Sequence, residues 1–139
     1  MDIPTPSVPP VLEIGRRLVE LCQNHEDAKA IEELYADDAQ HIEAYEMGPG
    51  MPRITAGKDK LLANIKDWYA NNEVHSSSTV GPYPHGEDRF AVTMTADMTP
   101  KAGPMAGQRH QIEEVSVYTV KGGKIVTAEF YWDPTKFGE

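Results

Sequence analysis

A pair of glycines, Gly122-Gly123, lies between two stretches rich in β-branched and aromatic residues, and this pattern constrains the fold more than any other feature. Two glycines accept the positive φ angles of a tight hairpin turn, so the flanking stretches 108–120 and 124–132 are predicted to pair as antiparallel strands. Two further strands are predicted at 73–80 and 89–98, separated by a turn over 81–86. The second half of the chain therefore predicts a long antiparallel sheet.

The first half of the chain carries apolar residues at the helical spacings of three and four. This spacing predicts a helix over 11–24 and a second helix that begins at an Asn24 N-cap, with Asp27 in a first turn where negative charge suits the helix dipole. A strand over 39–45 and a third helix over 58–71 follow. Helices that precede a long antiparallel sheet pack on one of its faces, so the predicted fold class is α+β.

The chain of 139 residues carries 13 Lys and Arg against 22 Asp and Glu, a formal net charge of −9. Nucleic acids and anionic membranes are bound by clustered basic residues, and the longest basic cluster is Arg16-Arg17, so neither partner is expected. Residues 11–133 have the usual size of one domain, about 100 to 150 residues, between a flexible proline-rich tail over 1–10 and a C-terminal tail over 134–139. With Cys22 as the single cysteine, a buried thiol and a cytoplasmic location are expected.

The segment that joins the second helix to the first strand, Leu34-Tyr35-Ala36-Asp37-Asp38-Ala39, the start of the last strand, Gly123-Lys124-Ile125, and the order of elements resemble the SnoaL-like branch of the nuclear-transport-factor-2-like superfamily. The resemblance implies that residues 11–133 form one SnoaL-like domain. It implies a cone, also called a cystatin-like α+β barrel, whose curved antiparallel sheet wraps around the helices and leaves a pocket at one end. A homodimer through the outer sheet face is implied as well. Because this scaffold carries isomerases, cyclases, dehydratases, hydrolases and binding proteins, it leaves the function open.

Ketosteroid isomerase belongs to the same superfamily, and its catalytic base follows the tyrosine of the matching segment at a position that is Glu43 in this chain. The resemblance also implies that the second acid of the isomerase, part of its oxyanion hole, lies near Glu113 or Glu114. The tyrosine that the isomerase carries on its first helix is matched only by Leu18 or Val19. This chain therefore departs from the isomerase at one of the three catalytic positions.

Glu43 lies between apolar neighbours on a predicted strand. If its side chain faces the interior, partial loss of solvent raises its pKa toward the range of a general base that removes a proton next to a carbonyl. His41 shares its face through the two-residue period of a strand, which allows the two side chains to act as a dyad. An exposed carboxylate and a histidine at the rim explain the same pattern without any catalysis.

Glu113 and Glu114 point to opposite faces of the predicted strand 108–120, and alternation alone does not decide which of them faces the interior. A tight turn that pairs the two lysines beside the glycines favours Glu113, whereas alignment to the isomerase with one extra hairpin residue favours Glu114. We favour Glu114, because Tyr118 shares its face and is able to supply the phenol that the first helix lacks. A β-bulge reverses either interpretation.

Aromatic side chains gather in the segments expected around the pocket, a lining that suits a small apolar or aromatic molecule held by a few polar groups. Ordinary core packing explains many of the same residues. The predicted ligand-binding residues are Trp68, Tyr69, His75, Tyr83, Glu113, Phe130 and Trp132.

No glycine-rich phosphate loop and no nucleophile elbow occur in the sequence, so no cofactor is expected. His41 and Glu43 with a distant histidine form only a weak metal pattern, and no metal is predicted. One predicted function is a cofactor-free enzyme that performs acid-base chemistry of the isomerase, cyclase or lyase type on a small apolar carbonyl compound, with His41, Glu43, Glu114 and Tyr118 as catalytic residues. The other is a non-catalytic module that binds an apolar ligand or dimerises.

Overall fold

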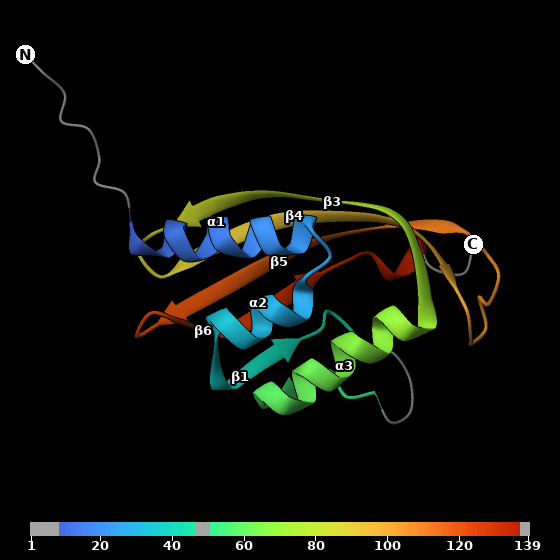
Figure 1. Cartoon of the computed structure of the whole chain (residues 1–139), viewed down its shortest axis with the longest axis horizontal. Coiled ribbons are helices and arrows are strands. Elements are labelled where there is room, and N and C mark those ends of the chain that lie inside the picture. Colours follow the sequence, from blue (N-terminus) through green and yellow to red (C-terminus); the bar gives the residue numbers. More distant parts are fainter. Residues whose placement is uncertain (1–8, 47–50, 137–139) are drawn as a thin grey trace, which may run out of the picture.

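The computed structural model describes residues 9–46 and 51–136, and these contain three α-helices and six β-strands. The helices are α1 (Pro10–Gln23), α2 (Asp27–Leu34) and α3 (Lys58–Asn71), and a short 3-10 helix covers Pro134–Lys136. The strands are β1 (Tyr35–Ile42), β2 (Ile54–Ala56), β3 (Asn72–His85), β4 (Arg89–Pro100), β5 (His110–Lys121) and β6 (Lys124–Tyr131). They form one sheet in the order β2-β1-β6-β5-β4-β3, which curves around the helices (Figure 1). The predicted α+β fold of helices on one side of a curved sheet is confirmed.

The sheet is mixed rather than wholly antiparallel. β1 runs parallel to β6, and every other pair of neighbours is antiparallel. The period of a strand does not reveal its partner, so the sequence pattern gave no sign of this pairing. The short strand β2, which pairs with β1, was not predicted either.

Two predicted boundaries of the helical half need correction. Helix α3 covers the predicted residues, but α2 begins at Asp27 and not after Asn24. Asn24 instead ends α1, where its backbone N–H bonds to carbonyl groups of that helix, and His25 follows with a φ of 58°, outside the right-handed helical region. β1 begins at Tyr35, directly after α2, and so leaves no loop between helix and strand.

The predicted turn over 81–86 is also shorter in the structure. β3 continues through an irregularity after Val80 and pairs Tyr83 with Ala91 and His85 with Arg89, so only residues 86–88 form the turn. Gly81 and Pro82 were interpreted as turn residues, but they bend an edge strand that remains paired with β4.

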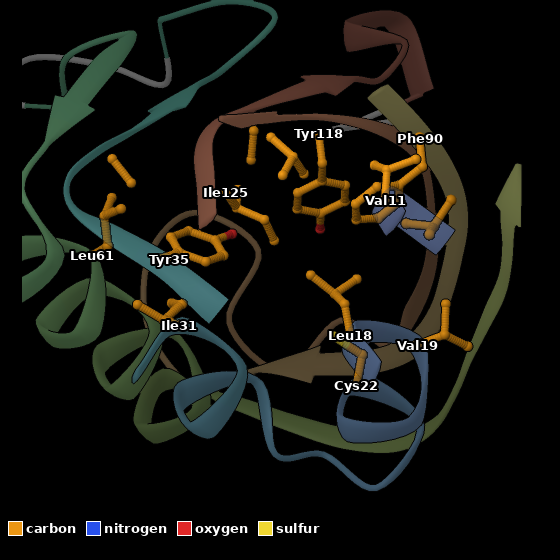
Figure 2. Packing of buried hydrophobic residues seen from close by; sticks show 14 residues of the cluster. Val11, Leu18, Val19, Cys22, Ile31, Tyr35, Leu61, Phe90, Tyr118 and Ile125 are labelled. Atoms are coloured by element: carbon orange, nitrogen blue, oxygen red, sulfur yellow. The ribbon is translucent and has the colours of Figure 1, made fainter. Parts of the chain in front are cut away.

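The core lies between the concave face of the sheet and the helices (Figure 2). Phe90 on β4 and Tyr118 on β5 stack with ring centroids 4.9 Å apart, and Leu18 of α1 and Ile125 of β6 are fully buried in the same cluster. Cys22 belongs to this cluster too, and burial raises the pKa of its thiol. The predicted buried cysteine is therefore confirmed.

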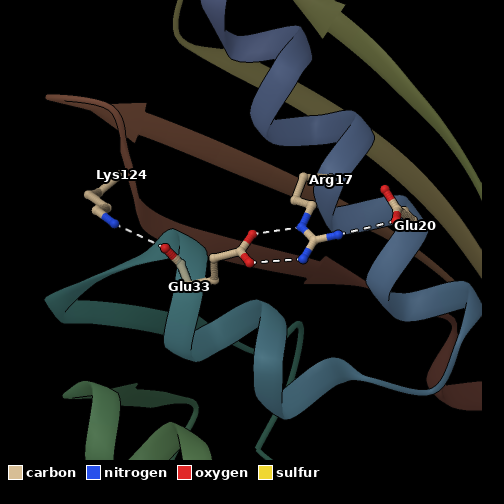
Figure 3. Close-up of polar contacts among 4 residues, drawn as sticks. All are labelled: Arg17, Glu20, Glu33 and Lys124. Atoms are coloured by element: carbon tan, nitrogen blue, oxygen red, sulfur yellow. Dashed lines mark hydrogen bonds and ion pairs between the residues drawn. The ribbon is translucent and has the colours of Figure 1, made fainter.

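Charged side chains join the helical hairpin to the β5–β6 turn on the outside of this core (Figure 3). Arg17 on α1 donates two hydrogen bonds to the carboxylate of Glu33 on α2, at 2.7 and 2.9 Å, and a third to Glu20 at 3.1 Å. Lys124 donates to the backbone carbonyl of Glu33 at 3.0 Å. Each exposed ion pair contributes little to stability. We therefore infer that these contacts mainly fix the position of α1 and of the β5–β6 turn relative to α2.

Parts of three predictions fall outside the described residues: the flexible tail over 1–10, the C-terminal tail and the loop that contains residues 47–50. In the part of the chain that the structure describes, no helix has the length and apolar character needed to cross a membrane.

Candidate active site

A bulge in the last hairpin determines which glutamate of β5 faces the interior. Lys121 pairs with Lys124, as in the tight-turn alternative, but the register then shifts by one residue, so that Val120 pairs with Ile125 and Thr119 with Thr127. Beyond the shift, Tyr118 lies opposite Ala128 and Ser116 opposite Phe130, and residues directly opposite each other share a face. Glu114 shares this inner face by the two-residue period, whereas Glu113 points outward.

Burial decreases along the inner face from one end of the sheet to the other. On β5 the side chains of Tyr118 and Ser116 are fully buried and Glu114 is half-buried. Burial also decreases on β6 from Ala128 to Phe130, and on β1 toward its C-terminal end. Glu114, Phe130 and the residues at the end of β1 thus lie at the less buried end of the inner face.

Glu43 lies just beyond the end of β1, at this less buried end of the sheet. Its carboxylate accepts a hydrogen bond from the indole N–H of Trp132 at 3.0 Å. Burial raises the pKa of Glu43, and the hydrogen bond from Trp132 opposes that effect by stabilising the charged form. The ring of Tyr45 packs against that of Trp132, with centroids 5.5 Å apart. The side chain at the predicted base position is therefore half-buried and held by a specific donor.

Glu114 has the most strongly perturbed carboxyl group of the site. Burial, followed by the charges of Glu43 and Asp27, raises its pKa to about 7. The residue as a whole is half-buried, while its carboxyl group is almost completely enclosed by protein atoms. The two acids of the site therefore have different environments, which is the condition under which one carboxyl group acts as a base and another as an acid.

His41 does not pair with Glu43 but with a residue that the sequence interpretation missed. Its Nε2 lies 2.8 Å from the hydroxyl of Tyr35, and its ring packs edge-on against Phe130, with centroids 4.9 Å apart. Burial lowers the pKa of His41 to about 4, so the ring is neutral at pH 7. The predicted dyad is thus replaced by separate Tyr35–His41 and Trp132–Glu43 pairs.

Tyr118 shares the inner face with Glu114, as predicted, but lies deeper, with 2% of its surface exposed. Burial raises its pKa well above the ordinary value of tyrosine, so its hydroxyl stays protonated. In the interior view the hydroxyls of Tyr118 and Tyr35 both point into the space between the sheet and α1 (Figure 2). Two phenols therefore face the region where the first helix has Leu18.

A third acid, Asp27 at the start of α2, was interpreted only as a first-turn residue that suits the helix dipole. In the structure it is half-buried and accepts a hydrogen bond from the hydroxyl of Tyr69 on α3 at 2.9 Å. Burial raises the pKa of Asp27, and the Tyr69 hydrogen bond and the charge of His25 oppose this. The available signal was its position four residues before the apolar Ile31, a spacing that puts both side chains on one face of a helix.

The remaining predicted ligand-binding residues divide into two groups. Trp68 is half-buried on α3, with its ring 5.0 Å from that of Tyr69. Glu113, His75 and Tyr83 lie on the outer side of the sheet: Glu113 opposite Thr95, Tyr83 opposite Ala91, and His75 bonded to the Thr99 hydroxyl at 2.7 Å. The structure does not bring these three to the interior, because bulges in β3 and β6 change which face each residue occupies.

Among residues 9–46 and 51–136, no group of three histidine, cysteine or acidic side chains lies close enough together to hold a metal ion.

Replacing Trp132 with phenylalanine is expected to raise the pKa of Glu43 further, because burial persists while the hydrogen bond that stabilises the carboxylate is lost. An NMR titration of the side-chain carboxyl carbon of Glu43 measures this change. Trp68→Phe is the matched control, since it alters a half-buried indole on α3. An unchanged or lower Glu43 pKa in Trp132→Phe contradicts the assigned role of the indole.

A curved sheet wrapped around a helical hairpin and a third helix is the fold of the nuclear-transport-factor-2-like class of proteins. The model of the SnoaL-like domain matches residues 11–132. The chain belongs to this family.

Comparison with solved structures agrees with this assignment. A proposed SnoaL-like polyketide cyclase from Mesorhizobium loti is 40% identical, with a TM-score of 0.79, over 88% of this chain and 98% of that protein. A proposed isomerase from Bacillus subtilis, 20% identical, has a TM-score of 0.69 over 91% of this chain and 88% of its own. A proposed polyketide cyclase from Xanthomonas campestris, 12% identical, has a TM-score of 0.67 over 92% and 93%. The latter two share the fold only, and no curated protein matches the chain.

Proposed function

We propose that this protein is a cofactor-free enzyme that performs isomerase-, cyclase- or lyase-type acid-base chemistry on a small, largely apolar carbonyl compound. The observation that carries the proposal is the pair of interior acids with different environments. Glu43, whose carboxylate accepts the hydrogen bond from Trp132, acts as the base that removes a proton next to the carbonyl. Glu114, whose pKa is about 7, donates a hydrogen bond to the carbonyl oxygen while it is protonated.

The neighbouring phenols and rings have supporting roles in this proposal. Tyr118 and Tyr35 are protonated donors deeper in the interior, in the region where the related isomerase has its first-helix tyrosine. The edge of His41 and the rings of Phe130 and Trp132 provide apolar surface for the body of the ligand. Cyclase-type chemistry is also what the description of the similar Mesorhizobium loti protein proposes for that protein.

The proposal is tested by exchange of the α-protons of 1-indanone for deuterium in D2O, followed by proton NMR. Wild-type protein is expected to accelerate the exchange, and Glu43→Gln to reduce the acceleration by about 100-fold or more, the usual contribution of a general base. The acceleration should also decline above pH 7 as Glu114 loses its proton. Glu113→Gln, on the outer side of the sheet, is the control. Equal exchange by wild type and Glu43→Gln removes the enzymatic proposal.

A non-catalytic ligand-binding module is the alternative, and the departure at the first helix favours it. At Leu18 the chain presents a fully buried aliphatic side chain instead of a catalytic phenol. Under this alternative wild-type protein binds the ketone but leaves the exchange rate at that of the buffer.

We also propose that the protein, in the cytoplasm, forms a homodimer through the outer face of its sheet. Val80, Thr93, Val115 and Tyr131 form one row across four strands of that face, and Val80, Val115 and Tyr131 are 48%, 39% and 54% exposed. Exposed apolar surface of this kind is typical of an interface. Light scattering after size exclusion should give twice the chain mass for wild type and the chain mass for Val115→Glu; a monomeric wild type contradicts the proposal.

A further inference from the structure

Tyr35 and His41 of β1 form a hydrogen-bonded pair whose geometry is fixed on both sides. The hydroxyl of Tyr35 lies 2.8 Å from Nε2 of His41, and the two rings meet edge-on with centroids 5.5 Å apart. Tyr35 is 4% exposed, and among the residues that the structure describes its hydroxyl bonds to His41 alone. The imidazole also packs edge-on against the ring of Phe130. The orientation of the imidazole is therefore determined by its neighbours.

The imidazole of His41 is neutral, so only one of its two ring nitrogens carries a proton. Burial lowers the pKa of His41 to about 4, and no carboxylate in the described part of the chain forms an ion pair with it. In a neutral imidazole one nitrogen donates a hydrogen bond and the other accepts one, and the partner of one nitrogen determines which is which.

The hydroxyl of Tyr35 decides between the two tautomers. If Nε2 carried the proton, it would donate to the tyrosine oxygen, and the hydroxyl proton of a buried residue would have no acceptor, which is unfavourable. If Nδ1 carries the proton, the hydroxyl donates to Nε2 and both groups are satisfied. The pairing with Tyr35 therefore favours the tautomer in which His41 has an Nδ1–H.

This Nδ1–H has no acceptor within residues 9–46 and 51–136, because the hydrogen bond of His41 to another side chain uses Nε2. Every fully enclosed side-chain nitrogen or oxygen of these residues has a hydrogen-bond partner, so Nδ1 is not fully enclosed and remains accessible. His41 pairs with Ala128, which lies opposite Tyr118, and residues that lie opposite each other share a face. An accessible donor therefore lies on the inner face of the sheet.

The position of His41 separates it from Glu114, the other proposed donor. His41 lies in the same row across the sheet as Tyr118, whereas Glu114 lies four residues further along β5, about 13 Å at the rise of a strand. Glu43 follows His41 by two residues toward the same less buried end. An oxygen that accepts the Nδ1–H is therefore a different atom from the carbonyl oxygen assigned to Glu114.

We infer that Tyr35 is a positioning residue that holds His41 in the Nδ1–H tautomer, and that this N–H donates a hydrogen bond to a second oxygen of the ligand. The inference rests on the proposed function and deepens it, because the ligand becomes a carbonyl compound whose apolar body carries a further acceptor oxygen, deeper in the cone than the reacting carbonyl. His41 then determines specificity: a ligand without that oxygen leaves a partly buried donor unpaired.

The first experiment determines the tautomer by long-range ¹H–¹⁵N correlation NMR on the full chain at pH 7, with His41→Gln used to assign the signals. We expect Nδ1–H in the wild type. Tyr35→Phe should allow the proton to distribute between both nitrogens. Tyr69→Phe is the matched control, since it removes a tyrosine hydroxyl that bonds to Asp27, and it should leave the His41 signals unchanged. An Nε2–H in the wild type overturns the inference.

The second experiment measures by calorimetry the binding of 5-methoxy-1-indanone and 5-ethyl-1-indanone, which have similar shapes and differ by an acceptor oxygen. His41→Gln retains a polar atom at the position of Nε2 and none at that of Nδ1, whereas His41→Asn retains an N–H near the position of Nδ1. The affinity ratio, methoxy over ethyl, should be about fivefold higher for wild type and His41→Asn than for His41→Gln, on the scale of one neutral hydrogen bond.

An equal ratio in wild type and His41→Gln, or failure of both ketones to bind, overturns the inference. Neither experiment measures proton exchange, so the result with Glu43→Gln decides the acid-base proposal separately. A protein with the expected tautomer and affinity ratio that does not accelerate exchange binds this class of ligand without transforming it.

Discussion

Glu114→Gln is expected to make the protein more stable at pH 8 by roughly 3 kcal/mol, because a carboxyl group whose pKa is raised from 4.5 to about 7 opposes folding when it is ionised. Glutamine has the same shape and no charge. The variant therefore removes both the desolvation of a carboxylate and its repulsion by Glu43 and Asp27.

The pH dependence has a definite sign. In the unfolded chain Glu114 loses its proton near pH 4.5, whereas in the folded protein it keeps the proton until about pH 7. Between these values the folded state binds more protons than the unfolded state, so the contribution of Glu114 to the free energy of unfolding decreases as the pH rises, and it is constant above and below this window. Glu114→Gln should remove this decrease.

Urea denaturation at pH 4, 6 and 8 measures the effect. The wild type and Glu114→Gln should differ little at pH 4 and most at pH 8. Glu113→Gln is the matched control, because it changes the adjacent glutamate on the opposite face of the same strand and should retain the pH dependence of the wild type. A constant difference between wild type and Glu114→Gln across the three pH values contradicts an interior carboxyl group with a raised pKa.

Helices and strands whose apolar residues repeat regularly could be predicted closely from the sequence. The face on which a strand residue lies could not, because it depends on how that strand pairs with its neighbour. Helix α3 has the predicted bounds because its apolar side chains repeat at helical spacing between a glycine and two asparagines. Which of Glu113 and Glu114 faces the interior depends on one extra residue in β6. The alternation of apolar residues in one strand cannot locate such a bulge, because a bulge is defined by the pairing with the neighbouring strand. The same limit explains the outward position of Tyr83, which a bulge in β3 controls.

The acids of the candidate site differ in a similar way. Glu43 could be predicted because a recognisable segment fixes its distance from Tyr35 along the chain. Asp27 was missed because an acid in the first turn of a helix already has an ordinary explanation in the helix dipole. Only the packing of α2 against α3, which brings Tyr69 to its carboxylate, turns that residue toward the interior. Tyr35 was missed for a related reason: as a buried aromatic it needs no further role until its hydroxyl is seen beside His41.

Gly15→Ala is the second variant with a large expected effect. It should make the protein less stable, although helix propensity alone predicts that it makes the protein more stable. In an open helix alanine is about 1 kcal/mol more favourable than glycine. At Gly15 of α1, however, an added Cβ would lie 2.7 Å from Cβ and 2.9 Å from Cγ of Pro82, and 3.2 Å from a ring carbon of Phe90. A proline ring on a paired strand cannot rotate away, so α1 must shift from β3. Overpacking of a core costs about 1 to 3 kcal/mol.

We therefore expect Gly15→Ala to lower the free energy of unfolding by up to about 2 kcal/mol after the gain in propensity is included. Urea denaturation should show a lower midpoint with an unchanged slope. A double-mutant cycle with Pro82→Gly identifies the cause: without the ring, the same Gly15→Ala change should become neutral or stabilising, because only the propensity and a mild contact with Phe90 remain. If Gly15→Ala stabilises the otherwise unchanged protein, α1 does not pack on β3 as closely as the structure describes, and the position of Leu18 above the two phenols is then incorrect as well.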